Sequence, residues 1–169
     1  TFARDGEADP YERVSIQSVI SNVLELTAER LRNQNIDLKL EIPETPIFID
    51  ARETQLTQVL GNMLKNAKDA IEKNSEKWIQ ISVFQNESHL VLKIMDCGKG
   101  IPLEIQEKLM TPFFTTKELG KGTGLGLSIS KGIIEDHQGK IEIDNSCPNT
   151  CFVITLPLSK NTAIANQAA

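Results

Sequence analysis

Apolar residues recur every three to four positions over two long segments of the chain, residues 15–33 and 52–73. This spacing places them on one face of a helix, so each segment predicts an amphipathic helix. Between the two, residues 36–42 alternate apolar and polar side chains, which predicts a half-buried strand, and residues 47–49 predict a short partner strand. The first half of the chain therefore combines helices with strands.

The second half has shorter apolar segments, which are separated by turn-forming residues. Two strands, residues 78–85 and 90–95, are separated by a few polar residues, and this arrangement predicts a hairpin. The further expected elements are a short helix opened by Pro102, a helix over 125–137, and strands over 140–144 and 152–156. This order predicts an α+β fold, a two-layer sandwich whose mixed sheet carries helices on one face.

The length of 169 residues suits a single domain with polar ends. Residues 1–13 contain a glycine and a proline and predict a linker. We expect residues 14–158 to form the domain and residues 159–169, rich in asparagine and alanine, to form a disordered tail.

Composition excludes some classes of partner. The 18 basic and 23 acidic residues are interspersed and give a net charge of -5, which argues against a surface that neutralises nucleic-acid phosphates. We find no apolar run of the roughly 18 to 20 residues that a membrane span requires. Three cysteines make no paired framework, so we expect free thiols and a cytoplasmic location, although a bridge between Cys147 and Cys151 is an alternative.

A polar stripe runs along the second long helix. Asn62, Asn66, Asp69 and Lys73 fall within about a quarter of its circumference, with Lys65 beside them. Most such stripes are simply solvated. Asparagine is a mediocre helix former, however, so two of them one turn apart indicate a functional role. One such role is coordination of Mg²⁺ by an amide oxygen beside phosphates.

Two glycine-containing segments could also bind a ligand. Residues 96–100 (DCGKG) follow a hydrophobic strand and could form a simple turn. Alternatively, the Asp96 carboxylate could accept a hydrogen bond from an exocyclic amine, and the glycines could let a flat ring approach the backbone. Residues 120–127 (GKGTGLGL) run into a helix start, where free backbone amides can bind an anion and Lys117 or Lys121 can add positive charge. The segment matches neither a Walker A loop nor a dinucleotide-binding turn, and a flexible surface loop is the alternative.

Together these segments resemble the boxes of the GHKL ATPase superfamily, which includes histidine kinases, type II topoisomerases, mismatch-repair ATPases and ninety-kilodalton heat-shock chaperones. The resemblance is greatest to the catalytic ATP-binding domain of bacterial sensor histidine kinases, and it covers roughly residues 14–158. The matching segments are Asn62–Ala67 (N box), Asp96–Ile101 (G1 box), Pro112–Lys117 (F box) and Gly122–Leu127 (G2 box).

The resemblance implies a Bergerat-type fold that binds ATP and Mg²⁺. Asn66 would hold the Mg²⁺, Lys117 would meet the γ-phosphate, and these two residues would carry the catalysis. Asp96 would accept a hydrogen bond from the adenine amino group. The nucleotide-contacting residues that the resemblance implies are Asn62, Lys65, Asn66, Asp69, Asp96, Gly98, Gly100, Ile101, Phe113, Thr116, Lys117, Gly122, Thr123, Gly124, Leu125, Gly126 and Leu127.

The phosphate acceptor that such a kinase requires is missing from the chain. Neither His89, in an expected strand, nor His137, at a helix end, matches the family's acceptor motif, so we expect both to be structural. The resemblance therefore implies an excised catalytic domain that acts on a histidine-bearing helical hairpin, of which residues 1–13 would be the tail. It further implies a response regulator as partner and a monomeric fragment, and it leaves open whether the parent protein is anchored in a membrane.

Three other functions stay open at this point. An ATP-driven conformational module would need a carboxylate base, for which Glu53 and Asp69 are candidates, but the position one turn before Asn66 is Asn62, an amide that cannot take a proton. A serine kinase of the anti-sigma type shares the boxes, and a regulatory nucleotide-binding domain without turnover is the third. The sequence departs from the family at residues 145–151 (NSCPNTC), which we expect to affect a peripheral hairpin only.

Overall fold

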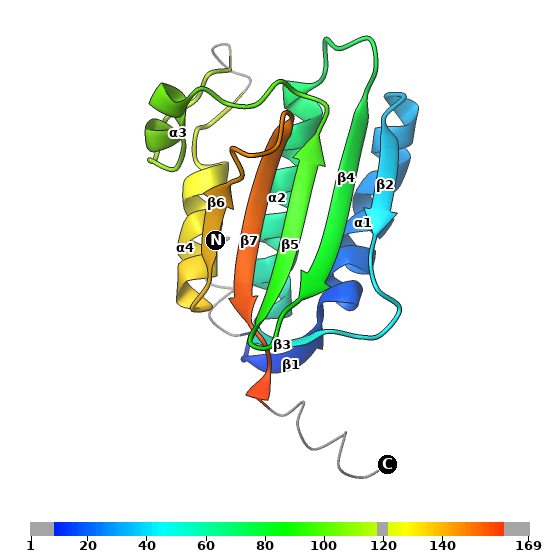
Figure 1. Ribbon diagram of the computed structural model, residues 1–169, viewed down its shortest axis with the longest axis vertical. Coiled ribbons are helices and arrows are strands. Elements are labelled where there is room, and N and C mark those ends of the chain that lie inside the picture. The colour runs from blue at the N-terminus through cyan, green and yellow to red at the C-terminus, as the bar shows by residue number, and fades with distance from the viewer. Residues whose placement is uncertain (1–8, 118–121, 161–169) are drawn as a thin grey trace.

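The computed structural model describes residues 9–117 and 122–160, which form two layers, a five-stranded sheet and the helices that cover one of its faces (Figure 1). The elements are β1 (Glu12–Ser15), α1 (Ile16–Asn33), β2 (Asp37–Glu41), β3 (Phe48–Ala51), α2 (Glu53–Ala70), β4 (Trp78–Gln85), β5 (His89–Asp96), α3 (Leu103–Leu109), α4 (Gly126–Asp136), β6 (Lys140–Ile143) and β7 (Thr150–Pro157). The predicted α+β sandwich with a mixed sheet is confirmed.

The large sheet has the strand order β2-β4-β5-β7-β6. β2 pairs with β4 in parallel, whereas the other neighbours are antiparallel. A separate antiparallel pair, β1 and β3, lies at one end of the molecule (Figure 1). The end of β5 lies beside the start of its antiparallel neighbour β7, with Asp96 opposite Thr150.

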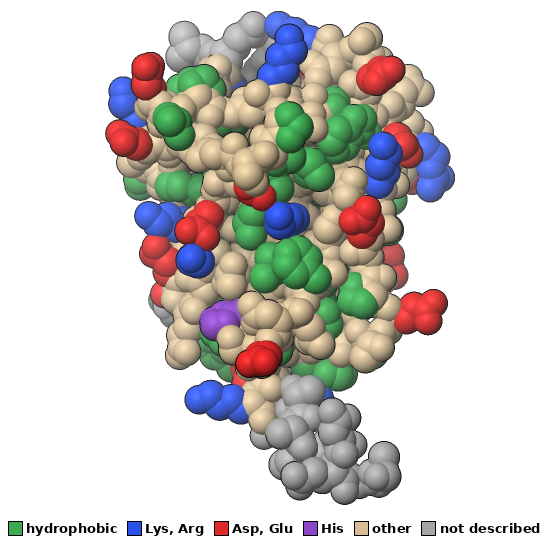
Figure 2. Space-filling model, in the orientation of Figure 1, with side chains coloured by type: hydrophobic (Ala, Val, Ile, Leu, Met, Phe, Trp, Pro, Cys, Tyr) green, Lys and Arg blue, Asp and Glu red, His purple; other side chains and the backbone are tan. Residues whose placement is uncertain are grey.

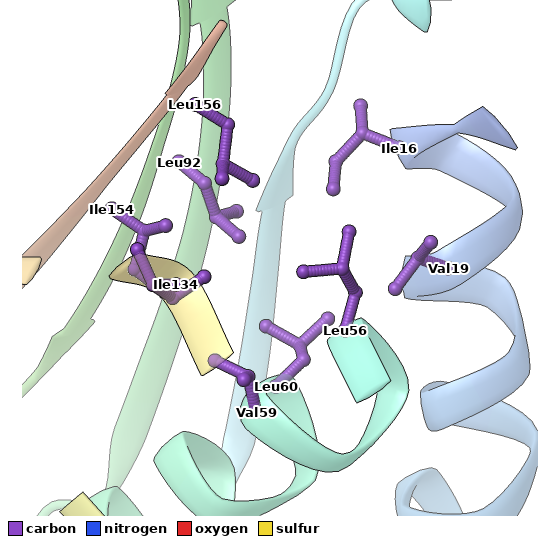
Figure 3. Close-up of a pocket in the computed structure, with 9 residues that line it drawn as sticks. All are labelled: Ile16, Val19, Leu56, Val59, Leu60, Leu92, Ile134, Ile154 and Leu156. Carbon is purple, nitrogen blue, oxygen red and sulfur yellow. The ribbon is translucent and has the colours of Figure 1, made fainter. Parts of the chain in front are cut away.

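Helices α1, α2 and α4 bury their apolar faces against the sheet. The Ser15 hydroxyl caps α1 by accepting the Ser18 N–H at 3.1 Å. Figure 3 shows aliphatic side chains from three helices and two strands pointing toward one another where the layers meet. The gap that they leave is only about 10 Å³ and is lined by hydrocarbon, so it is a packing space in the core and not a ligand site.

The opposite face of the sheet carries no helix among the described residues, and it displays charged side chains between hydrophobic ones (Figure 2). None of the described helices is long and apolar enough to cross a membrane.

Both ends of the domain differ in detail from the expected boundaries. Glu12 and Arg13, expected in a linker, belong to β1, which is too short to show a sequence period and buries only Val14. At the other end Ser159 is buried, and its hydroxyl donates to Asp50 Oδ1 at 2.8 Å. Most of the expected linker and tail, residues 1–8 and 161–169, lies outside the described residues.

Candidate functional site

The polar stripe of α2 faces the segment that leads into α4. Asn62, Asn66 and Asp69 are half-buried, so the stripe is not an ordinary solvated surface. Asn62 Nδ2 donates to the Gly126 carbonyl at 3.4 Å and to Ser130 Oγ at 3.3 Å, which fixes α2 against the first turn of α4. Lys73 does not belong to this surface, because α2 ends at Ala70 and Lys73 lies exposed in the following turn.

Lys117 lies against the polar face of α2. Its Nζ lies 2.6 Å from Asp69 Oδ2 and 3.4 Å from Asn66 Oδ1, although Lys117 is 48 and 51 positions further along the chain than these two residues. All three side chains are half-buried. The fold thus brings a cation, a carboxylate and an amide oxygen together beside the start of α4.

Asp96, the last residue of β5, has a buried carboxylate and is only 3% exposed. Burial raises its pKa to about 6, while hydrogen bonds from the Gly98 N–H, at 2.7 Å, and from Thr150 act in the opposite direction. The carboxylate is therefore mostly ionised at neutral pH, and it can accept a further hydrogen bond from an amine.

The turn after β5 requires its glycines. A Cβ on Gly98 would lie 2.7 Å from both Asp96 Oδ1 and Thr150 Oγ1, closer than side chains are ever found. Gly100 has a φ of +85°, a backbone conformation that other residues rarely adopt. The glycines of residues 96–100 are thus explained by close approach and by conformation.

Two residues that hydrogen-bond to this turn, Asn149 and Thr150, were not predicted from the sequence. Thr150 Oγ1 accepts the Gly100 N–H at 3.2 Å, and Asn149 Nδ2 donates to the Gly98 carbonyl at 3.2 Å. The expectation that residues 145–151 affect a peripheral hairpin only is therefore wrong. The useful signal would have been the pairing of β5 with β7, which sets Thr150 opposite Asp96 but is not visible in a single sequence.

The F-box segment and the end of the glycine-rich segment pack together. A Cβ on Gly124 would lie 2.5 Å from the backbone carbon of Phe113, and one on Gly122 would lie 2.8 Å from Lys117 Cδ. Gly124 and Phe113 both have positive φ, +68° and +64°. Because they lack a Cβ, Gly124 can lie directly beside Phe113 and Gly122 directly beside Lys117.

The remaining predicted site residues differ in how far they are exposed to solvent. Ile101 and Leu127 are half-buried against the core. Lys65, Thr116 and Thr123 are exposed, and the Thr123 hydroxyl accepts the Leu125 N–H at 3.4 Å. Gly120 and Lys121 lie outside the described residues.

Neither histidine belongs to this site. His137 is buried, its Nε2 accepts the Arg52 N–H at 3.1 Å, and its Nδ1 lies 2.7 Å from the Ile133 carbonyl. His89 lies in β5, where its Nδ1 is 2.7 Å from Ser88 Oγ. Within residues 9–117 and 122–160, no group of three or more His, Cys, Asp or Glu residues could hold a metal ion.

The arrangement offers one region for a base and another for phosphates. Asp96 and the open backbone of residues 98–100 suit a flat ring with an exocyclic amine. The glycine-rich start of α4 presents backbone N–H groups, and Lys117 adds positive charge, which together suit phosphate oxygens.

Comparison with known proteins supports this interpretation. Residues 51–160 match the family described as histidine kinase-, DNA gyrase B-, and HSP90-like ATPase. The chain is 35% identical over 145 residues to the C4-dicarboxylate transport sensor protein DctB of Pseudomonas aeruginosa, covering 85% of the chain and 24% of the relative. It is 31% identical over 156 residues to sporulation kinase E of Bacillus subtilis, covering 92% and 21%. The chain therefore spans less than a quarter of the length of these curated relatives.

Solved structures show the same similarity. The catalytic domain of histidine kinase ThkA in its nucleotide-free form superposes with a TM-score of 0.78 at 35% identity, covering 87% of this chain and 95% of that one. ThkA in complex with the response regulator protein TrrA gives a TM-score of 0.76 at 31% identity, covering 90% of this chain and 43% of that one.

The buried carboxylate leads to a prediction about stability. Because the pKa of Asp96 is raised to about 6 in the folded protein, the folded state holds its proton at pH values where the unfolded state has lost it. Its contribution to the free energy of unfolding should therefore fall as pH rises from ~4 to ~6, by up to about 3 kcal/mol. Asp96→Asn removes this term, so the variant should gain stability relative to the parent over that interval. Urea titrations of both proteins at several pH values measure the difference, and a pH-independent difference would contradict the assignment.

Proposed function

Because the chain belongs to the family of histidine kinase-, DNA gyrase B-, and HSP90-like ATPases, we propose that it binds Mg-ATP and donates the γ-phosphate to a histidine on a separate helical hairpin. This is the role of the catalytic domain in a two-component sensor histidine kinase. The observation that carries the proposal is that the α2 amides contact both the glycine-rich start of α4 and Lys117, while a buried carboxylate, Asp96, ends β5 beside a glycine turn. A response regulator is the expected downstream partner, and the domain is expected in the cytoplasm.

The residues present fit ATP in chemistry and in shape. Asp96 is already held by the Gly98 N–H, so its carboxylate is oriented before an adenine amino group arrives. Gly98 and Gly124 occupy positions where a Cβ would collide with neighbouring atoms, so the close approaches on both sides of the site depend on glycine. Residues 98–101 would form the wall against the adenine, and residues 122–127 would contact the phosphates.

Asn66 is the candidate ligand for Mg²⁺. Its Oδ1 is a hard oxygen ligand, it is half-buried, and it lies 3.4 Å from Lys117 Nζ, the group assigned to the terminal phosphate. When bound there, Mg²⁺ would supply positive charge that neutralises the phosphates. Lys117 is paired with Asp69 at 2.6 Å, so contact with a γ-phosphate would require this pair to loosen or to be shared.

The arrangement disfavours an ATP-hydrolysing conformational module. Of the two candidate bases, Asp69 is paired with Lys117, and Glu53 Oε1 accepts hydrogen bonds from Ser18 and Asn22 on α1. Asn62, at the position where relatives that hydrolyse ATP would carry the base, donates from its amide to α4. Transfer to an external histidine asks the protein only for positioning and charge neutralisation, which these residues can supply.

Two exposed apolar side chains near Lys117 and the start of α4, Phe113 and Ile129, suit contact with the acceptor hairpin. Phe113 is 76% exposed and is held with positive φ against Gly124, and Ile129 on α4 is 42% exposed. Exposed aromatic and aliphatic side chains next to a reaction site are typical of a contact surface for a partner. We propose that the hairpin docks here, with its histidine presented toward Lys117.

Removal of Mg²⁺ should weaken binding of a non-hydrolysable ATP analogue to the parent chain by about tenfold, equivalent to ~1.4 kcal/mol. In Asn66→Ala the affinity should be nearly the same with and without Mg²⁺, because the protein ligand to the metal is gone. Asn22→Ala, an asparagine variant on α1, should keep the parent's dependence. Calorimetry in Mg²⁺ and in chelator measures all three, and an unchanged Mg²⁺ dependence in Asn66→Ala would contradict the assignment.

Phosphate transfer to a hairpin supplied in trans tests the reaction itself. Lys117→Ala should lower the transfer rate by about 100-fold, as expected for loss of a charge that stabilises the transition state. Phe113→Ala should retain nucleotide binding but lose about tenfold or more in transfer, because an aromatic anchor contributes ~2 kcal/mol to an interface. Phe84→Ala, an exposed phenylalanine on the opposite face of the sheet, is the control and should transfer normally. Transfer is followed with radiolabelled ATP, and a Phe113→Ala rate equal to that of the control would rule out this docking surface.

A further inference from the structure

A second cluster of reactive side chains lies on the open face of the sheet, directly behind the adenine side of the site. Met95 on β5 is paired with Cys151 on β7, and the next pair along is Asp96 with Thr150. Successive residues of a strand point to opposite faces. Asp96 and Thr150 therefore face the helices, whereas Met95 and Cys151 face the other way.

The turn between β6 and β7 brings a second thiol to the same place. The Cys147 N–H donates to the Asp144 carbonyl at 3.4 Å, and the Asp144 N–H donates to the Cys151 carbonyl at 2.9 Å. These contacts fold the turn back, so that Cys147 Sγ lies 3.3 Å from Met95 Sδ, on the strand beside Cys151. Met95 thus contacts Cys147 and is the direct cross-strand partner of Cys151, which places both cysteines beside one side chain, and both thiols are free in this structure.

The two thiols differ in accessibility. Cys147 is half-buried and lines a pocket of about 440 Å³ together with Lys99, Ile101 and Asn149, so a small solute can reach it. Cys151 is only 1% exposed, and burial raises the pKa of its thiol to about 11. Lys93, whose ammonium lies 3.1 Å from Asp144 Oδ2, partly offsets the effect of burial on the pKa of Cys151, and Asp144 acts in the opposite direction.

We propose that Cys147 and Cys151 form a peroxide-sensitive thiol pair whose disulfide weakens nucleotide binding. The Cys147 sulfur attacks hydrogen peroxide: an S–O bond forms, the O–O bond breaks, and one water leaves, giving a sulfenic acid. The Cys151 sulfur then attacks the Cys147 sulfur, so that an S–S bond forms, the S–O bond breaks, and a second water leaves with the thiol proton. In total two thiols lose two electrons to one peroxide molecule, which is reduced to two waters.

The consequence for the nucleotide site follows from what lies between the two cysteines. Asn149, which donates to the Gly98 carbonyl, and Thr150, which bonds the Gly100 N–H, both stand within the ring that a 147–151 disulfide would close. A disulfide demands a specific separation and direction of the two Cβ atoms. Closing so short a ring would move this turn and break its hydrogen bonds to residues 98–100. The effect on affinity rests on the proposed ATP site, whereas formation of the bridge does not.

Oxidation of the full chain tests both parts of the proposal. The reduced protein is treated with hydrogen peroxide, its disulfides are mapped by mass spectrometry, and its affinity for a non-hydrolysable ATP analogue is measured before oxidation, after it and after re-reduction. We expect a Cys147–Cys151 bridge and a loss of affinity of about tenfold, the effect of losing about two hydrogen bonds, which reduction restores. Cys147→Ser and Cys151→Ser should each abolish the change.

Cys97→Ser is the matched control. Cys97 lies beside Asp96, but its thiol donates to the Glu76 carbonyl at 3.2 Å, away from the pair, so this variant should still lose affinity on oxidation. The proposal is overturned if no 147–151 bridge forms, if the bridged protein binds as tightly as the reduced one, or if Cys97→Ser is insensitive. If the reduced parent binds no nucleotide, the proposed function fails together with the coupling, and the mapped disulfide alone decides whether the thiols pair.

Discussion

The burial of the Asp96 carboxylate, at the last residue of β5, determines how one side of the candidate site is built. Burial of a charge in a protein interior is costly unless donors surround it. Here the donors come from the turn that follows, through the Gly98 N–H, and from the neighbouring strand, through Thr150. The pairing of β5 with β7 places Thr150 beside the carboxylate, and Asn149 holds the glycine turn that donates to it. The candidate site therefore depends on the sheet as much as on its motifs.

Helix α2 packs against β5, the strand that carries Asp96, and its two faces have different roles. Its apolar face packs in the core with α1 and the sheet, which fixes its position. Its polar face is half-covered by α4 and by Lys117, so Asn62, Asn66 and Asp69 are held in place by contacts made elsewhere in the chain. The packing of α2 in the core thereby holds its amide and carboxylate groups beside Lys117.

Much of this could be predicted from the sequence, because periodicity reports burial. The long helices, the hairpin of β4 and β5 and the clusters at residues 62–69 and 96–101 follow from spacing and from the local preferences of Asn and Gly. The contacts that depend on strand register could not be predicted. β1 is four residues long and too short to show a period, and Thr150 became a site residue only through its pairing with Asp96. The packing of Cys147 on Met95 likewise depends on how one turn folds back over the sheet.

The measurement that tests the account most directly compares a non-hydrolysable ATP analogue with its inosine counterpart, which has an oxygen in place of the adenine amino group. If Asp96 accepts a hydrogen bond from that amino group, calorimetry should show the inosine compound binding about ten to a hundredfold more weakly, the ~1.5–3 kcal/mol of a hydrogen bond to a charged group. Equal affinity for the two compounds would contradict the assignment of Asp96 and, with it, the proposed position of the nucleotide.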